Sequence, residues 1–251
     1  MAGVTFSIHP DLDSLSRAAA RRISALAAEA CAAHGAFTLS LSGGSTPRRL
    51  YQTLTEPEFR DSIDWARVHI YFGDERCVPP DHPDSNYGMV EAALLRHVPI
   101  PPAQVHRIDV ATASVRQDAL RYAQFIATHV PLDSQSVPSF DLILLGMGPD
   151  GHTASLFPNT CILREQQQAA AAVYVEKFQT WRVSMTYPIL NHARQLMFLV
   201  AGADKADMLR RTHVEPPGNN PLPIQRIAAQ GAVEWLLDSA AAAQLPSEMT
   251  A

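Results

Sequence analysis

An aspartate and a histidine two residues apart, Asp150 and His152, are the side chains in this sequence best suited to proton transfer. They lie in the glycine-rich segment GMGPDGHTAS, which overlaps the end of the apolar run FDLILLG. A free imidazole has a pKa of about 6.5, so histidine can take up and release a proton near neutral pH. A carboxylate two residues away in a tight turn can orient the imidazole or share its proton. We therefore expect His152 to be a general base and Asp150 to be its partner.

Three glycines of the same segment follow the spacing G-x-G-x-x-G, which also occurs in loops that bind dinucleotides. A dinucleotide loop requires a long helix that begins within it, because the helix N-terminus holds the pyrophosphate. Here Pro158 stands only seven residues after Gly151, so any helix is short or kinked. Asp150 would also place a negative charge beside the pyrophosphate. Glu176 lies at a suitable distance downstream for a ribose contact, so an NAD(P)-binding oxidoreductase is kept as an alternative.

A second glycine-rich segment, SGGST, lies between an expected strand at 36–42 and an expected short helix. Two glycines let the backbone approach a ligand closely, and the exposed amides, two hydroxyl groups and the helix dipole would face an anion. The segment lacks the Gly-Lys-Ser/Thr ending of a Walker A loop. A tight turn that uses glycine for geometry alone is the other interpretation. The candidate phosphate-binding residues are Gly43, Gly44, Ser45 and Thr46.

A charged run, Asp74, Glu75 and Arg76, ends the expected strand at 68–74. Such a run is usually a solvated turn. At the ligand-binding edge of a sheet, Arg76 could instead stabilise a developing oxyanion or hold a carboxylate.

Apolar strand-like runs alternate with helical patterns along nearly the whole chain. This alternation predicts an α/β fold with a doubly wound, mostly parallel sheet in one domain, residues 1–251. In an open sheet of this kind, ligands collect beyond the carboxyl ends of the strands, where the three polar segments above are expected. The expected strands are at 36–42, 68–74, 140–146, 172–176, 182–186, 195–201 and 231–238, and the longer helices at 13–34, 86–98, 114–130 and 205–213.

The composition excludes several classes of protein. With 47% hydrophobic and 18% charged residues and a net charge of −5, the 251-residue chain is typical of a globular protein without a basic stripe for nucleic acid. Three scattered cysteines favour a reducing compartment. The start of the chain has no signal-peptide pattern, and the apolar run at 196–203 is too short to cross a membrane, so a cytoplasmic protein is expected. Neither metal-ligand spacing nor a G-x-S-x-G serine elbow is present.

Three blocks in register, SGGSTPRRLY, FGDERCVPPDHPDSNYG and LLGMGPDGHTASLFP, resemble the 6-phosphogluconolactonases, a family related to glucosamine-6-phosphate deaminase/isomerase. The resemblance runs from about residue 36 to residue 238. It implies a single Rossmann-like domain that hydrolyses 6-phosphoglucono-δ-lactone to 6-phosphogluconate in the pentose phosphate pathway, without a metal or organic cofactor. The implied partner is a phosphorylated sugar lactone, and we expect a monomer or a small homo-oligomer.

The resemblance also assigns residues. The family's catalytic histidine falls on His152, its aspartate partner on Asp150 and the basic residue of the second block on Arg76. This chain departs from the family where EKFQTWR replaces a Pro-Lys-Pro-Pro-like stretch, and where Asn159 replaces a common glycine. The positions assigned to the sugar phosphate are the 43–46 loop, Asp74, Lys177, Arg182 and Lys205.

Two alternatives follow from the same resemblance. The deaminase motif resembles D-G-H-I-A-F-N-E-P, and its glutamate assists ring opening. Phe157 occupies that position here, so isomerisation of an aldose loses support. A non-catalytic sugar-phosphate sensor is disfavoured because the Asp150–His152 pair is intact.

Overall fold

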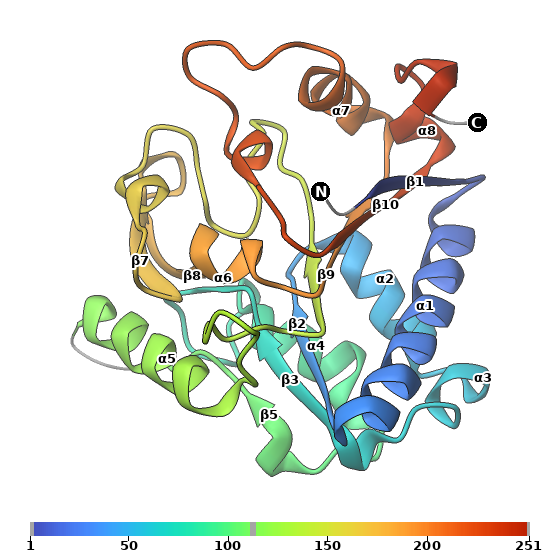
Figure 1. Ribbon diagram of the computed structural model, residues 1–251, viewed down its shortest axis with the longest axis vertical. Coiled ribbons are helices and arrows are strands. Elements are labelled where there is room, and N and C mark those ends of the chain that lie inside the picture. The colour runs from blue at the N-terminus through green and yellow to red at the C-terminus, as the bar shows by residue number, and fades with distance from the viewer. Residues whose placement is uncertain (1–2, 111–113, 250–251) are drawn as a thin grey trace.

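A seven-stranded sheet forms the centre of the computed structural model, which describes residues 3–110 and 114–249 (Figure 1). The strand order is β1-β10-β9-β6-β2-β3-β5, and every neighbouring pair is parallel. The predicted α/β fold with a mostly parallel sheet is therefore confirmed. The strands are β1 (Val4–His9), β2 (Phe37–Leu41), β3 (Val68–Phe72), β5 (Val105–His106), β6 (Leu142–Leu145), β9 (Gln195–Val200) and β10 (Ala232–Asp238).

Strand order reverses between β2 and β6. From β2 the chain continues to β3 and β5 on one side, and it later returns to build β6, β9 and β10 on the other side. Every residue of β2, β6 and β9 is buried, as expected when both faces of a parallel sheet are covered. Loops that leave the carboxyl ends of β2 and β6 diverge at this reversal, which leaves a crevice between them.

A second, antiparallel sheet in the order β4-β8-β7 stands beside the first. The runs at 172–176 and 182–186 were expected in the parallel sheet, and that expectation is wrong, because they form strands of this second sheet. Apolar alternation identifies a strand but not the strand with which it pairs, so the error lies in the pairing. The three strands are β4 (Asp74–Arg76), β7 (Ala170–Val175) and β8 (Thr180–Met185).

Gly73 joins the two sheets. Its N–H donates to the carbonyl of Leu41 in β2 at 2.9 Å, and its carbonyl accepts from the N–H of Met185 in β8 at 2.8 Å. The expected single strand at 68–74 is therefore two strands: β3 ends before Gly73, and β4 starts after it in the other sheet. This change of sheet brings the charged run that begins at Asp74 to the crevice.

The helices follow local signals in the sequence. Helix α1 begins after Asp11, which accepts a hydrogen bond from the N–H of Ser14 at 2.7 Å, and ends at Gly35 with φ of 89°. Helix α4 begins after Ser85 as expected, but it ends at Ala93 and is followed by the 3₁₀ turn Leu95–His97. The helices are α1 (Leu12–His34), α2 (Ser45–Leu54), α3 (Pro57–Arg60), α4 (Asn86–Ala93), α5 (Val115–His129), α6 (Tyr187–Asn191), α7 (Ala206–His213) and α8 (Ser239–Ala242).

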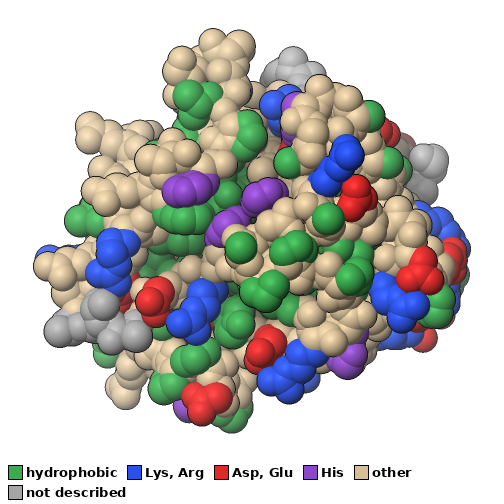
Figure 2. Space-filling model, turned by 90° about the horizontal axis from the view of Figure 1, so that it is seen from below, with side chains coloured by type: hydrophobic (Ala, Val, Ile, Leu, Met, Phe, Trp, Pro, Cys, Tyr) green, Lys and Arg blue, Asp and Glu red, His purple; other side chains and the backbone are tan. Residues whose placement is uncertain are grey.

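Both sheets share one cluster of buried apolar side chains. Helix α1 packs on α2, β1, β2 and β10, whereas α5 packs on β7 and β8 of the small sheet (Figure 1). Within the described ranges, no helix combines the length and apolarity needed to span a bilayer. On the face shown in Figure 2, Lys and Arg side chains lie among Asp and Glu side chains instead of gathering in one patch.

A buried tyrosine fixes the start of the loop that follows β2. The hydroxyl of Tyr51 donates to the carbonyl of Ser42 at 2.7 Å and accepts from the N–H of Ser42 at 3.0 Å. Tyr51 is fully buried, and burial raises the pKa of its hydroxyl far above the ordinary value, so the group remains a neutral donor. Helix α2 is thereby tied back to the strand that precedes it.

We expect the substitution Tyr51→Phe to destabilise the protein by about 1–3 kcal/mol, because two buried backbone groups lose their partner. Urea unfolding followed by circular dichroism measures this change. The exposed Tyr174 provides the matched control, and Tyr174→Phe should leave the unfolding midpoint in place. Equal midpoints for wild type and Tyr51→Phe would contradict this anchoring role.

Candidate active site

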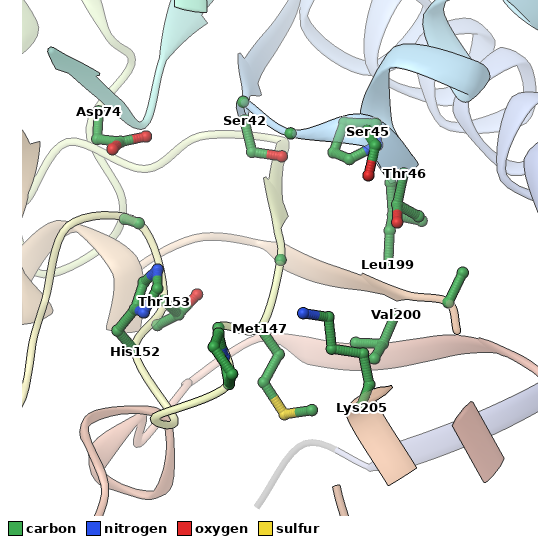
Figure 3. A pocket seen from close by; sticks show the side chains of 18 of the residues that line it. Ser42, Ser45, Thr46, Asp74, Met147, His152, Thr153, Leu199, Val200 and Lys205 are labelled. Atoms are coloured by element: carbon green, nitrogen blue, oxygen red, sulfur yellow. The ribbon is translucent and has the colours of Figure 1, made fainter. Parts of the chain in front are cut away.

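A cavity of about 260 Å³ opens at the carboxyl ends of β2, β6 and β9, beside β4 and β8 (Figure 3). The structure brings nine of the predicted site residues to its walls, from loops far apart in the sequence. Asp150 lies behind His152, and Lys177 lies outside the cavity. The nine are Gly43, Gly44, Ser45, Thr46, Asp74, Arg76, His152, Arg182 and Lys205.

The imidazole of His152 is held on three sides. Its Nδ1 forms a short hydrogen bond with Oδ1 of Asp150, which leaves Nε2 for the cavity. One face stacks on the Phe157 ring, with centroids 4.0 Å apart and an interplanar angle of 26°. The ring also abuts Gly148: a Cβ atom at that position would lie 2.0 Å from Nδ1 and Cε1 of the imidazole. The imidazole therefore has little freedom to rotate.

Asp150 is a carboxylate held in its charged form. Burial raises its pKa, but the hydrogen bonds and electrostatic interaction with His152 and the charge of Lys177 outweigh burial and lower the pKa to about 2. The N–H of His152 also donates to Oδ1 of Asp150 at 3.3 Å. A carboxylate in this position selects the imidazole tautomer and stabilises the imidazolium when a proton arrives.

The loop between 146 and 160 is a series of turns. The N–H of Gly148 donates to the carbonyl of His152 at 2.9 Å, and Gly151 has φ of 74° in the left-handed region. The carbonyl of Gly151 accepts from the N–H of Ile224 at 3.1 Å. All residues of this loop are described, and no helix begins until the 3₁₀ turn Cys161–Arg164. An NAD(P) site would lack the helix N-terminus that a pyrophosphate needs.

The other glycine-rich loop presents the N-terminus of α2 to the cavity. Gly44 is the N-cap with φ of 111°, and no side chain caps this helix end. Amide groups of the first turn are therefore left for an anion, which the helix dipole also favours. A residue other than glycine does not fit at position 43, because a Cβ atom there would lie 1.9 Å from Oδ1 of Asn86.

The Asp74 carboxylate lies at the cavity wall, but its partners are other side chains of the protein. Its Oδ2 accepts from the hydroxyl of Ser155 at 2.5 Å and lies 3.7 Å from Nη1 of Arg182. Its Oδ1 accepts from the amide of Asn86 at 3.2 Å. Asp74 therefore holds together β8, α4 and the loop at 146–160 that carries His152, which we call the histidine loop.

Glu75 fixes the same segment to the start of α4. Its carboxylate is buried and accepts from the N–H groups of Asn86 and Tyr87, each at 2.8 Å. Burial raises the pKa of Glu75, while these backbone hydrogen bonds act in the opposite direction. The charged run of the sequence is thus a buried junction and not a solvated turn.

Three cationic side chains line the cavity. Arg182 is buried, and its guanidinium lies over the ring of Phe157 at 5.3 Å. Arg76 donates through Nη1 to the carbonyl of Asp84 at 2.6 Å. Lys205 pairs with Asp204 at 3.0 Å, and Figure 3 shows its side chain extending into the pocket. The cavity is therefore electropositive and suits an anionic ligand.

Four polar atoms that face or adjoin this cavity are buried and make no hydrogen bond to any described residue. They belong to side chains on four different segments of the chain. Buried polar atoms in proteins are nearly always paired, so four unpaired ones beside a single cavity are an exception. The atoms are Ser42 Oγ, Arg76 Nε, Thr153 Oγ1 and Arg182 Nε.

Residues of the site that were not predicted from the sequence include Ser42, Thr153 and Asn86. Ser42, at the end of β2, and Thr153, in the loop after β6, lie beside predicted residues, and that adjacency was the available signal. Asn86 acts through Gly43 and Asp74, and no sequence pattern indicates that contact. In the described ranges, 3–110 and 114–249, no three His, Cys, Asp or Glu side chains are grouped as metal ligands.

Comparison with known proteins agrees with this geometry. Residues 10–235 match the family described as glucosamine-6-phosphate isomerases/6-phosphogluconolactonase. The chain belongs to this family. A Synechocystis protein named 6-phosphogluconolactonase is 41% identical over 217 residues, which cover 86% of this chain and 88% of the relative. A Haemophilus influenzae protein of the same name is 39% identical over 204 residues, 81% of this chain and 85% of the relative.

Solved structures of the family share the fold. The 6-phosphogluconolactonase of Trypanosoma brucei superposes with a TM-score of 0.85 at 28% identity, over 98% of this chain and 100% of that one. A monomeric glucosamine-6-phosphate deaminase, 18% identical, superposes with a TM-score of 0.79 over 96% and 99% of the two chains. At that identity the deaminase shows only that the fold is shared.

We expect Gly148→Ala to lower kcat for lactone hydrolysis by about 10²-fold. The new methyl group must displace the imidazole that it would touch. Steady-state kinetics measures the loss, and thermal unfolding establishes that the variant is folded. Gly218→Ala, where a Cβ atom meets nothing within 4 Å, is the control and should retain full activity. Undiminished turnover in Gly148→Ala would show that the position of the ring is unimportant.

The lowered pKa of Asp150 predicts how its contribution to stability depends on pH. Because the folded-state pKa of about 2 lies below the ordinary 3.8, the carboxylate stabilises the fold above about pH 4, and this stabilisation is lost as the pH falls towards 2. Asp150→Asn should therefore lower the free energy of unfolding by about 1–2 kcal/mol at pH 5–8.

Urea unfolding of both proteins between pH 8 and pH 3 measures this difference, which should shrink below pH 4. The exposed Asp81 supplies the control substitution, Asp81→Asn. A difference between wild type and Asp150→Asn that grows as the pH falls would contradict the assignment.

Proposed function

We propose that this protein hydrolyses 6-phosphoglucono-δ-lactone to 6-phosphogluconate. The observation that carries the proposal is the Asp150–His152 pair at one wall of a small cationic cavity, with the uncapped N-terminus of α2 at another. Family membership supports the same conclusion, since curated relatives over most of the chain carry the name 6-phosphogluconolactonase. The proposal includes a cytoplasmic location, a monomer or small homo-oligomer, and a phosphorylated sugar lactone as the partner.

The substrate phosphate binds at the first turn of α2. Ser45 and Thr46 lie across the pocket from His152 in Figure 3, and Lys205 extends into the space between them. Free amides and the helix dipole favour an anion, and a lysine adds a mobile positive charge. With its phosphate held there, the sugar ring extends towards His152, and this placement replaces a random encounter with a fixed one.

Hydrolysis then needs one activated water and one stabilised oxyanion. Nε2 of neutral His152 takes a proton from water as the water oxygen attacks C1 of the lactone. Arg76 or loop amides stabilise the tetrahedral oxyanion. When the C1–O bond breaks, the imidazolium returns its proton to the ring oxygen, and the carboxylic acid product ionises. Asp150 keeps the imidazole oriented and stabilises its cationic form throughout.

The stacked phenylalanine distinguishes this site from the deaminase alternative. Phe157 occupies the sequence position of the glutamate in the deaminase motif, and its ring covers one face of the imidazole. Aldose–ketose isomerisation would need a second group for proton transfer at that position. Lactone hydrolysis does not need one.

We expect His152→Ala to lower kcat by about 10²–10⁴-fold, the range of general acid–base catalysis, with little change in affinity for 6-phosphogluconate. A spectroscopic assay of lactone loss measures turnover, and glucosamine 6-phosphate serves as the parallel substrate. His97→Ala is the matched control, because His97 is exposed and its ring bonds to the carbonyl of Ala92. Full lactonase activity in His152→Ala, or turnover of glucosamine 6-phosphate by the wild type, would refute the proposal.

A further inference from the structure

The tip of the β7–β8 hairpin covers the outer side of the histidine loop. The chain turns there through Glu176–Phe178 and Gln179, which has φ of 47°. Phe178 contacts the ring of Phe157 edge to face at 5.9 Å, and the guanidinium of Arg182 lies 5.1 Å from the Phe178 ring. The same hairpin therefore supplies a buried arginine to the reaction cavity and closes over the back of the catalytic pair.

Lys177 at this tip lies on the opposite side of the histidine loop from the reaction cavity. It lines a separate surface cavity of about 750 Å³, together with Asp150 and Phe157. Lys205, the only other lysine of the chain, lines the reaction cavity. The two lysines thus face different spaces, and only Lys205 is placed to meet a phosphate bound at α2.

The two oxygens of Asp150 have different partners. Oδ1 bonds to Nδ1 of His152, whereas Oδ2 lies 3.7 Å from Nζ of Lys177. A cation on the second oxygen fixes the rotation of the carboxylate and hence the direction of the bond to the imidazole. We propose that Lys177 is a positioning residue, which acts on His152 through Asp150 and does not bind the sugar phosphate. This inference rests on the proposed function.

The electrostatic interaction between Lys177 and Asp150 supports this positioning role. The charge of Lys177 is among the causes that lower the pKa of Asp150. The lysine side chain is 56% exposed, so solvent screens the interaction. We therefore expect a modest effect, a fall in kcat of about two- to fivefold on removal of the ammonium group, as for other exposed ion pairs.

A double-mutant cycle with Lys177→Met and Asp150→Asn tests the proposal. Lys177→Met alone should lower kcat by about two- to fivefold with KM unchanged, and Lys177→Arg should recover most of that loss. In the Asp150→Asn background, Lys177→Met should have no further effect, because the carboxylate through which the ammonium group acts is gone. Arg96→Met, which removes an exposed arginine paired with Glu91, is the control and should retain wild-type kcat.

Two measurements without turnover separate this inference from the proposed function. Calorimetric titration with 6-phosphogluconate should give equal affinities for wild type and Lys177→Met. Ring ¹⁵N NMR should show the Nδ1 signal of His152 displaced in Lys177→Met and unmoved in Arg96→Met. Weaker binding of 6-phosphogluconate, an undisplaced Nδ1 signal, or an equal loss of kcat in both backgrounds would overturn the proposal. If the wild type has no lactonase activity, the proposed function fails, and the NMR result still decides the role of Lys177.

Discussion

The buried carboxylate of Asp74 is the contact on which the geometry of the site depends. It accepts hydrogen bonds from Ser155 in the histidine loop and Asn86 in α4, and it faces Arg182 in β8. A charge removed from water is stable only when it is paired and hydrogen-bonded, so these three groups must stay in place around it. Ser155 brings the histidine loop to the small sheet, and Asn86 limits position 43 to glycine. Both the His152 side of the cavity and the side formed by the 43–46 loop are therefore tied to one carboxylate.

The topology separates these two sides. The reversal of strand order between β2 and β6 sends the glycine-rich 43–46 loop and the histidine loop in different directions from adjacent strands. Cations approach the space between them from two further places, Arg76 and Arg182 on the small sheet and Lys205 after β9. The small sheet is thus more than a cover for the core, because its hairpin carries Arg182 to the inner side of the histidine loop and Lys177 to the outer side.

Features encoded within one segment could be predicted from the sequence, whereas features that depend on partners elsewhere could not. Helix α1 carries its own start at Asp11 and its own stop at Gly35. The glycine-rich loops could be placed at strand ends because apolar runs precede them. The antiparallel pairing of β7 with β8 could not be foreseen, since an apolar run has the same pattern in either sheet. Strand β1 was missed because it is a half-exposed edge strand with a weak apolar pattern. Lys177 was grouped with the phosphate on resemblance alone, and only the course of the hairpin places it beside Asp150.

The central claim is that α2 and His152 bind opposite ends of one substrate, and a crystal structure with bound 6-phosphogluconate tests it most directly. We predict that the phosphate will contact the amides of Ser45 and Thr46, with the C1 carboxylate of the product beside Nε2 of His152. A phosphate bound at His152, or a product bound in the outer cavity beside Lys177, would contradict the account.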